Sequence, residues 1–332
     1  MRPIGSKVKK LSALVCTYDR AELLRGTLES LCRQTLPAEE FEVVVVDDGS
    51  SDHTREVVAE FEGRLPLVGS YQRNAGLASA RNHGIYLSSG EISLLVDDDD
   101  LADPELVERH VEAHRRHPAV NVAVLGHTVM APALAADPLM HFVTEVGAFL
   151  FSYPFVKQGE YLDFSHFWGG RSSCKRAFLI EHGVFNPVFR FGCEDIELAY
   201  RLAKHDFKVI YEPRAVSVMV RPFDFDGFCR RLYRQGQSNL VFSRLHPEPA
   251  VQKWTEVEGA VARWREMEPH YERLMRTGSQ LDRLARLRAE AGLSSEDLDG
   301  QLLHAAYWTA FRASKVKGIA DKAVELEERT RS

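Results

Sequence analysis

The chain has 332 residues, 45% of them hydrophobic and 27% charged, and its formal net charge is −6. This length and composition predict a globular protein with one large domain and an appendage, or with two domains. The negative charge argues against a general nucleic-acid binder, which usually carries a basic patch. The five cysteines show no Cys-x-x-Cys spacing, so neither a disulfide framework nor a zinc site is expected.

The N-terminal region is basic but lacks the apolar core of a signal peptide. No stretch of the sequence is apolar for long enough to span a membrane. We therefore expect a cytoplasmic protein without a transmembrane segment, either in solution or peripheral to the inner face of the membrane.

The first third of the chain alternates between apolar, strand-like runs and amphipathic, helix-like runs. We expect strands over residues 11–16, 41–46, 67–71 and 93–97. Helices are expected between them, and Asp19, with Glu22 three residues on, is predicted to cap the first helix. This alternation is typical of a parallel sheet covered by helices, so we predict an α/β fold.

Further strands are expected near residues 120–129 and 207–211, and further helices over 104–116, over 176–182 and from Glu194 onward. Residues 131–165 show no regular pattern. In the last quarter, apolar residues recur at three- to four-residue steps, which indicates amphipathic helices. We expect the first of these to break near Gly278 and to end at Gly292, and we expect Ser294 with Asp297 to cap the next.

Four carboxylates follow an apolar run in the stretch Ser93-Leu94-Leu95-Val96-Asp97-Asp98-Asp99-Asp100. In open parallel sheets, ligands bind just beyond the carboxyl ends of the strands. Adjacent carboxylates repel one another unless a cation compensates them, and a hard divalent ion such as Mg²⁺ or Mn²⁺ prefers oxygen ligands. The alternative is a solvated acidic turn, in which Asp103 caps the helix that Pro104 opens.

Several short motifs follow one another along the chain: Cys16-Thr17-Tyr18, Asp47-Asp48-Gly49-Ser50, Asn74-Ala75-Gly76, Ala80-Arg81-Asn82-His83-Gly84, Asp97-Asp98-Asp99 and Glu194-Asp195. In this order and spacing they resemble the family 2 glycosyltransferases with the GT-A fold, over about residues 8–220. The resemblance implies a mixed, mostly parallel sheet with helices on both faces, followed by a C-terminal helical extension. It also implies a glycosyltransferase domain over 1–245, with a nucleotide-sugar half over about 8–130 and an acceptor half over about 131–245, and a helical region over 246–332.

The resemblance further implies which residues bind the nucleotide-sugar. Thr17 and Tyr18 would border the nucleotide, and Asp48 would accept a hydrogen bond from an N–H group of the base. Arg81 would lie near the diphosphate. The alternatives are a strand-end turn for Thr17, a capped turn for Asp48 and a solvated helix face for Arg81.

The same resemblance implies different roles for the carboxylates of residues 97–100. Asp97 matches the ribose-side carboxylate of an Asp-x-Asp motif, and Asp99 matches the ligand of a bound Mn²⁺ or Mg²⁺. Asp98 is an extra carboxylate that we include among the donor-binding residues; it and Asp100 would lie beyond the direct metal ligands or be solvated. His246 is a candidate further metal ligand, although a lone histidine is more often not a ligand.

On the acceptor side, Asp195 matches the catalytic base of a family that inverts the anomeric centre. Glu194 would orient the acceptor or brace the loop, and the alternative for both carboxylates is a favourable helix start. Trp168, Gly169 and Gly170 match the acceptor-binding segment, with a core tryptophan as the alternative for Trp168.

A loop-like stretch after the last strand could close over the diphosphate or form a solvated basic face; it contains Arg230, Arg231, Arg234 and Gly236. The expected reaction moves a sugar from a nucleoside-diphosphate sugar, with UDP-sugar as the first choice, to an acceptor hydroxyl. The acceptor could be a glycan, a lipid, a protein or a small molecule. The alternatives are a nucleotidyltransferase that makes nucleotide-sugars and an inactive scaffold that binds partners through its C-terminal helices. The apolar faces of these helices also favour a homo-oligomer.

Overall fold

The computed structural model describes residues 8–293 and 298–331. These residues form two compact units. The sheet unit contains residues 8–131, 156–190 and 194–221. The helical unit contains residues 132–155, residues 191–193 and the described residues from 222 onward. Whether a domain boundary lies between residues 245 and 246 stays a prediction.

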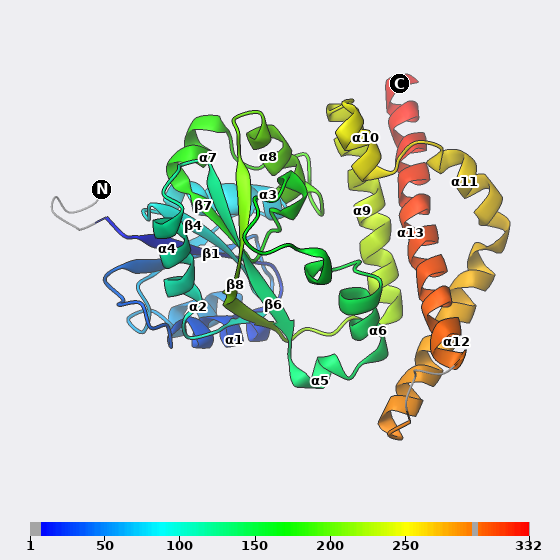
Figure 1. The fold of residues 1–332 in the computed structure, drawn as a ribbon, viewed down its shortest axis with the longest axis horizontal. Helices are drawn as coiled ribbons and strands as arrows, with labels where there is room; N and C mark the ends of the chain where they lie inside the picture. Colours follow the sequence, from blue (N-terminus) through cyan, green and yellow to red (C-terminus); the bar gives the residue numbers. More distant parts are fainter. Residues whose placement is uncertain (1–7, 294–297, 332) are drawn as a thin grey trace. The chain divides into compact units, whose positions relative to one another are not determined.

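The sheet unit is built on one mixed sheet (Figure 1). Its strands, in chain order, are β1 (Leu11–Thr17), β2 (Phe41–Asp47), β3 (Leu67–Tyr71), β4 (Ile92–Asp97), β5 (Asp100–Ala102), β6 (Val122–Met130), β7 (Ser172–Lys175) and β8 (Lys208–Met219). They are arranged in the order β3-β2-β1-β4-β7-β6-β8-β5. Strands β1 to β4 pair in parallel, as do β6 and β8, whereas β7 is antiparallel to both of its neighbours and β5 to β8. The mixed, mostly parallel sheet is therefore confirmed.

Helices cover both faces of this sheet, as predicted. The helices of the unit are α1 (Ala21–Leu31), α2 (Thr54–Glu60), α3 (Leu77–Leu87), α4 (Leu106–Arg116), α7 (Arg176–His182) and α8 (Glu194–Ala203). Ala13 and Val15 of β1 share one buried core with residues of α1, α2 and α4. Because side chains alternate along a strand, Leu14 points to the opposite face, where it packs with Val46 against Gly84 of α3.

The predicted cap of α1 is wrong. Asp19 has a left-handed backbone conformation with φ +51°, and its carboxylate accepts hydrogen bonds from the backbone N–H and hydroxyl of Ser51. The backbone N–H of Ala21, at the first turn of α1, instead donates to Asp52 at 3.0 Å. The side chain that accepts from the first turn of α1 is thus Asp52, 31 positions after Ala21, and not Asp19 as the local pattern predicts.

The helical unit confirms the predicted C-terminal extension. Its helices are α5 (Pro132–Ala135), α6 (Pro138–His141), α9 (Phe225–Leu245), α10 (Pro249–Thr255), α11 (Ala260–Met267), α12 (Tyr271–Glu290) and α13 (Leu298–Arg331). Helices α9 and α13 approach closely because Gly236 and Gly318 lack side chains. A Cβ at Gly236 would collide with the carbonyl of Lys315, and one at Gly318 with the carbonyl of Tyr233.

Three predictions for this region are wrong. The stretch from Arg230 to Gly236 is part of α9 and not a loop. Gly278 lies inside α12 against the ring of Phe225, so the helix does not break there. Residues 131–165 are not wholly irregular, since they contain α5, α6 and a π-helical turn over Phe142–Val146.

The predicted cap at Ser294 and Asp297 lies outside the described residues. Among the helices that the structure describes, none is both long and apolar enough to cross a membrane.

Candidate active site

The strands β1, β2 and β4 end at one edge of the sheet. Their register pairs Thr17 with Asp47 and Cys16 with Asp97, so the motifs after these strands meet there. The hydroxyl of Thr17 donates to Asp98 at 2.8 Å, which joins the first motif to the acidic run. Tyr18 is next to them and 48% exposed. The strand ends therefore bring together residues that lie about 80 positions apart in the sequence.

The acidic run is largely buried. Asp98, Asp99 and Asp100 are 4%, 7% and 1% exposed, so the interpretation of a solvated acidic turn is wrong. Burial raises the pKa of Asp98 to about 6 and that of Asp100 to about 7. Burial and the nearby charge of Asp97 also raise the pKa of Asp99. Each carboxylate is expensive to ionise here unless a positive charge lies beside it.

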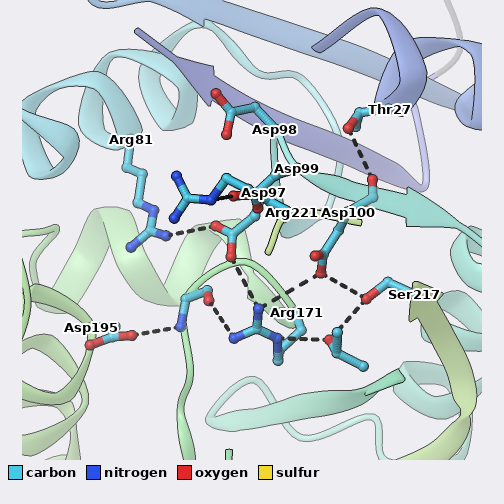
Figure 2. Close-up of polar contacts among 12 residues, drawn as sticks. Thr27, Arg81, Asp97, Asp98, Asp99, Asp100, Arg171, Asp195, Ser217 and Arg221 are labelled. Carbon is cyan, nitrogen blue, oxygen red and sulfur yellow. Dashed lines mark hydrogen bonds and ion pairs between the residues drawn. The ribbon is translucent and has the colours of Figure 1, made fainter. Parts of the chain in front are cut away.

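Four arginines supply such charges, and Figure 2 shows three of them, Arg81, Arg171 and Arg221. The ion pairs join Arg20 to Asp98 at 2.8 Å and to Asp99 at 3.5 Å, Arg221 to Asp99 at 3.0 Å, Arg81 to Asp97 at 3.6 Å, and Arg171 to Asp97 at 3.1 Å and Asp100 at 3.7 Å. The side chains of Arg81 and Arg171 are 6% and 10% exposed, whereas those of Arg20 and Arg221 are 38% and 26% exposed. The cluster thus has two buried cations and two that solvent reaches.

The sequence identifies one of these four arginines, Arg81. Arg171 directly follows the Trp168-Gly169-Gly170 segment, which is the one local signal that could have drawn attention to it. Arg20 and Arg221 belong to no motif, and their partners lie far away in the sequence. The alternative of a solvated helix face for Arg81 is wrong, because this residue is 5% exposed and donates to Glu194 at 2.8 Å.

The two glycines of the predicted acceptor segment are required by close approaches. A Cβ at Gly169 would collide with the guanidinium of Arg81, and one at Gly170 with the carboxylate of Asp97. Gly170 also has φ +92°, a conformation that side chains disfavour. These glycines therefore let the segment reach Arg81 and Asp97.

Asp195 is joined to the same segment. Its carboxylate accepts hydrogen bonds from the backbone N–H of Gly169 at 2.7 Å and of Ile196 at 2.8 Å. The carbonyl of Gly169 in turn accepts from Arg171 at 3.2 Å, and Arg171 donates to Asp97. A chain of hydrogen bonds therefore runs from the start of α8 to the end of β4 (Figure 2).

Two other predicted residues already have partners. Asp48 accepts hydrogen bonds from the side chain of Gln72 and from the backbone N–H groups of Ala75 and Gly76, so it holds the turn before α3. The half-buried Trp168 donates from its indole N–H to the carbonyl of Ser165 at 2.8 Å. The structural alternatives for both residues are thus real contacts, and their binding roles stay predictions.

Asp97 and Asp99 are the candidates for holding a divalent cation. Mg²⁺ usually takes one or two carboxylates and completes its shell with water and substrate phosphates. Within residues 8–293 and 298–331, no group of three or more His, Cys, Asp and Glu side chains is arranged to hold a metal. Asp97 and Asp99, whose charges lie close enough to influence each other, are a pair of carboxylates such as a cation of that kind would take. His246 follows α9 in the helical unit, and its ligation stays a prediction.

Comparison with known proteins shows which family the chain matches. A family model described as glycosyl transferase family 2 matches residues 12–180, about half of the chain. The validoxylamine A glucosyltransferase of Streptomyces hygroscopicus subsp. jinggangensis is 37% identical over 223 residues, which cover 60% of this chain and 53% of that protein. The chain thus spans about half the length of the first curated relatives that it matches.

Two solved structures have a similar fold. The mannosyltransferase PcManGT from Pyrobaculum calidifontis, in complex with GDP-Man and Mn²⁺, has a TM-score of 0.59 at 21% identity, covering 97% of this chain and 90% of that one. TarS of Staphylococcus aureus, in complex with UDP, has a TM-score of 0.56 at 18% identity, covering 97% of this chain and 92% of that one. At these identities the likeness shows the fold alone.

Proposed function

The chain belongs to glycosyltransferase family 2, and we propose that it transfers a sugar from a nucleoside-diphosphate sugar to an acceptor hydroxyl with inversion of the anomeric carbon. The observation that carries this proposal is the chain of hydrogen bonds from Asp195 to Asp97. It puts a candidate base and a candidate donor-binding carboxylate into one polar network. A nucleotidyltransferase would not need the base.

In the proposed reaction, the acceptor oxygen attacks the anomeric carbon from the face opposite the diphosphate. The bond between that carbon and the diphosphate oxygen breaks, and the nucleoside diphosphate leaves with the electron pair. Asp195 takes the proton of the acceptor hydroxyl. Its contact with Gly169 orients the carboxylate, and the ion pair of Glu194 with Arg81 favours a bracing role for Glu194.

On the donor side, Arg81 and the backbone next to Thr17 and Tyr18 would line the nucleotide and diphosphate. Asp97 would contact the ribose side, with Asp98 as an extra carboxylate behind it that Thr17 and Arg20 hold. Asp48 would accept from the base while it holds the turn before α3. We propose UDP-sugar as the donor. UDP is bound in TarS and GDP-Man in PcManGT, so the base has to be measured for this chain.

A divalent cation, Mn²⁺ or Mg²⁺, would be held by Asp99 and Asp97. When bound, such an ion stabilises the negative charge that develops on the leaving diphosphate. On the acceptor side, Trp168 would offer a ring face to a sugar or another acceptor, while its indole N–H donates to Ser165 and His166 stacks on its ring. Gly169 and Gly170 keep this segment close to the donor.

The test compares Asp195→Asn with Asp99→Ala. Purified wild type is first screened with UDP-sugars and GDP-sugars and Mn²⁺ for thermal shifts, because a bound ligand raises apparent stability. We expect Asp195→Asn to bind the nucleotide normally and to lose transfer or donor hydrolysis by about 10²–10⁴-fold, the range of general-base contributions. Asp99→Ala should lose Mn²⁺-dependent nucleotide binding as well as turnover.

Asp206→Asn serves as the matched control, since Asp206 is an exposed carboxylate of the loop before β8. It should behave as wild type in both measurements. Transfer by Asp195→Asn at a rate near that of wild type would refute the assignment of the base, and Glu194 would be tested next. Unchanged Mn²⁺-dependent affinity in Asp99→Ala would refute the metal assignment.

A further inference from the structure

We propose that Arg221 is an exchangeable cation: its guanidinium occupies Asp99 in the donor-free protein and moves to the diphosphate when the donor and a divalent cation bind. This inference rests on the proposed function, because it assumes that a nucleoside diphosphate is the ligand. It assigns Arg221 a binding role that no motif in the sequence indicates.

The first observation is that Arg221 and the expected cation need the same carboxylate. The guanidinium of Arg221 lies 3.0 Å from Oδ2 of Asp99, and Arg20 lies 3.5 Å from the same oxygen. A Mg²⁺ ion binds a carboxylate oxygen at about 2.0–2.1 Å. A cation on Oδ2 would therefore lie close to the positive charge of Arg221 and repel it.

The second observation concerns which arginines can move. The side chains of Arg81 and Arg171 are 6% and 10% exposed, and Arg171 also contacts Thr128 and the carbonyl of Gly169. The side chain of Arg221 is 26% exposed. Moving a buried guanidinium away from its carboxylate costs far more than moving one that solvent reaches, so Arg81 and Arg171 are the fixed cations of the cluster.

The third observation is that the backbone beside Arg221 is anchored. The backbone N–H of Val220 donates to the carbonyl of Asp99 at 3.2 Å. This contact keeps Arg221 next to the acidic run wherever its guanidinium points, so the exchange requires a rotation of the side chain and no movement of β8.

The diphosphate is the natural new partner of the displaced guanidinium. Arginine presents a planar fork of N–H donors that matches phosphate oxygens. A donor that approaches this edge of the sheet meets the carboxylates of Asp97 and Asp99, whose side chains are 31% and 10% exposed, and needs positive charge in addition to the metal. After the exchange, Asp99 would hold the metal and the guanidinium of Arg221 would pair with the diphosphate. Both the carboxylate and the diphosphate would then have a cation beside them.

The test titrates Mn²⁺ alone into donor-free protein and reads the dissociation constant by electron paramagnetic resonance of the free ion. Arg221→Ala should bind Mn²⁺ more tightly than wild type, on the order of tenfold, because one positive charge beside the ligand is gone. Arg214→Ala is the matched control, since Arg214 lies on β8 and pairs with Glu212 at 2.9 Å. It should leave Mn²⁺ affinity unchanged.

A second titration adds UDP at saturating Mn²⁺. Arg221→Ala should bind UDP on the order of tenfold more weakly, the loss expected for one charge-assisted contact. Arg221→Lys keeps the charge without the fork, so its Mn²⁺ affinity should resemble that of wild type while UDP binding is weaker. Circular dichroism and thermal melting of each variant show whether the fold is retained.

Unchanged Mn²⁺ affinity in folded Arg221→Ala, or an equal gain in Arg214→Ala, overturns the competition for Asp99. Unchanged UDP affinity in Arg221→Ala overturns the transfer to the diphosphate. If wild type binds neither UDP nor GDP with Mn²⁺, the proposed function fails and the transfer fails with it. The titration with Mn²⁺ alone still decides the competition in that case, so the two failures can be told apart.

Discussion

Arg171 joins four parts of the candidate site. It donates hydrogen bonds to Thr128 at 2.8 Å, to the carbonyl of Gly169 and to Asp97, and it forms an ion pair with Asp100. Because Asp100 is 1% exposed, its charge has little access to water and depends on this arginine. Arg171 is therefore a positioning residue, which holds the segment around Gly169 next to the acidic run.

Arg171→Ala should destabilise the protein by about 3–5 kcal/mol, the usual cost of removing one partner of a buried ion pair. The expected cause is the loss of Arg171's contacts together with the buried carboxyl of Asp100, which must take up a proton because its pKa, already raised to about 7 beside Arg171, rises further without it. The double variant Arg171→Ala/Asp100→Asn should therefore recover part of the loss in urea unfolding. If the double variant is as unstable as the sum of the single variants, the coupling between Arg171 and Asp100 does not exist.

The sequence predicted that Asp97 and Asp195 lie in one site, because both belong to a series of motifs that follow one another along the chain, and hydrogen bonds do join them; their roles stay predictions. The partners of these residues were not predictable. Arg171 contacts Asp97 across 74 positions and Arg20 contacts Asp98 across 78, so both pairs depend on the strand order and not on any local spacing. The four carboxylates suggested a missing cation, and arginines supply part of that charge.

At the scale of elements, α4 and β7 are joined by a buried polar network. His110 and His114, one turn apart on α4, both contact the hydroxyl of Ser173 on β7, at 2.8 and 2.9 Å. Lys175 lies 3.3 Å from the other ring nitrogen of His114. Burial lowers the pKa of His110 to about 3, and burial with the charge of Lys175 lowers that of His114 to about 2.

This network should make the protein sensitive to acid. Histidines of the unfolded chain titrate near pH 6.5. Below that pH the unfolded state binds protons, whereas the two buried histidines of the folded state stay neutral. Stability is then full above about pH 6.5 and falls as the pH decreases toward about 3, by at most about 1.4 kcal/mol per pH unit for each histidine. His114→Gln should remove one such contribution, measured by urea unfolding at several pH values.

The pH dependence of His114→Gln has to be compared with that of wild type, because the acidic run changes stability with pH in the opposite direction to the histidines. The raised pKa values of Asp98 and Asp100 mean that the folded state holds these protons more strongly. Their stabilising contribution is therefore lost as the pH rises from about 4 to about 7. His114→Gln leaves this part unchanged, so an identical pH dependence in the variant and in wild type would contradict the role of His114.

Regular elements were predictable when their pattern is local. The range 67–71 is β3 and the range 176–182 is α7, as the apolar and turn residues indicate. The predicted break at Gly278 failed because the residue is used for close packing against Phe225. The second half of β8 was missed because it pairs with β5 and β6, and pairing between distant segments leaves no local signal.

At the scale of the whole molecule, the helical unit has an apolar core of its own. Phe142, Phe228 and Phe311 are fully buried in one core together with residues of α12 and α13. The buried hydroxyl of Tyr307 donates to Asp282 at 2.6 Å, so even the polar groups of this core are paired. The apolar stripes seen in the sequence are thus satisfied largely by packing between the helices themselves.

What the helices leave uncovered favours self-association. Leu284 and Leu302 are 52% and 57% exposed, and both line one apolar hollow between α12 and α13. Apolar side chains gathered in one place mark interaction surfaces more often than scattered ones do. We therefore expect the molar mass in sedimentation to rise with concentration, and we expect Leu284→Lys and Leu302→Lys to prevent the rise, because association would bury a charge.

Val188→Lys, at an equally exposed residue of the sheet unit (53%), is the control and should associate like wild type. A wild type that stays monomeric at high micromolar concentration, or a loss of association in Val188→Lys, would contradict an interface at this hollow.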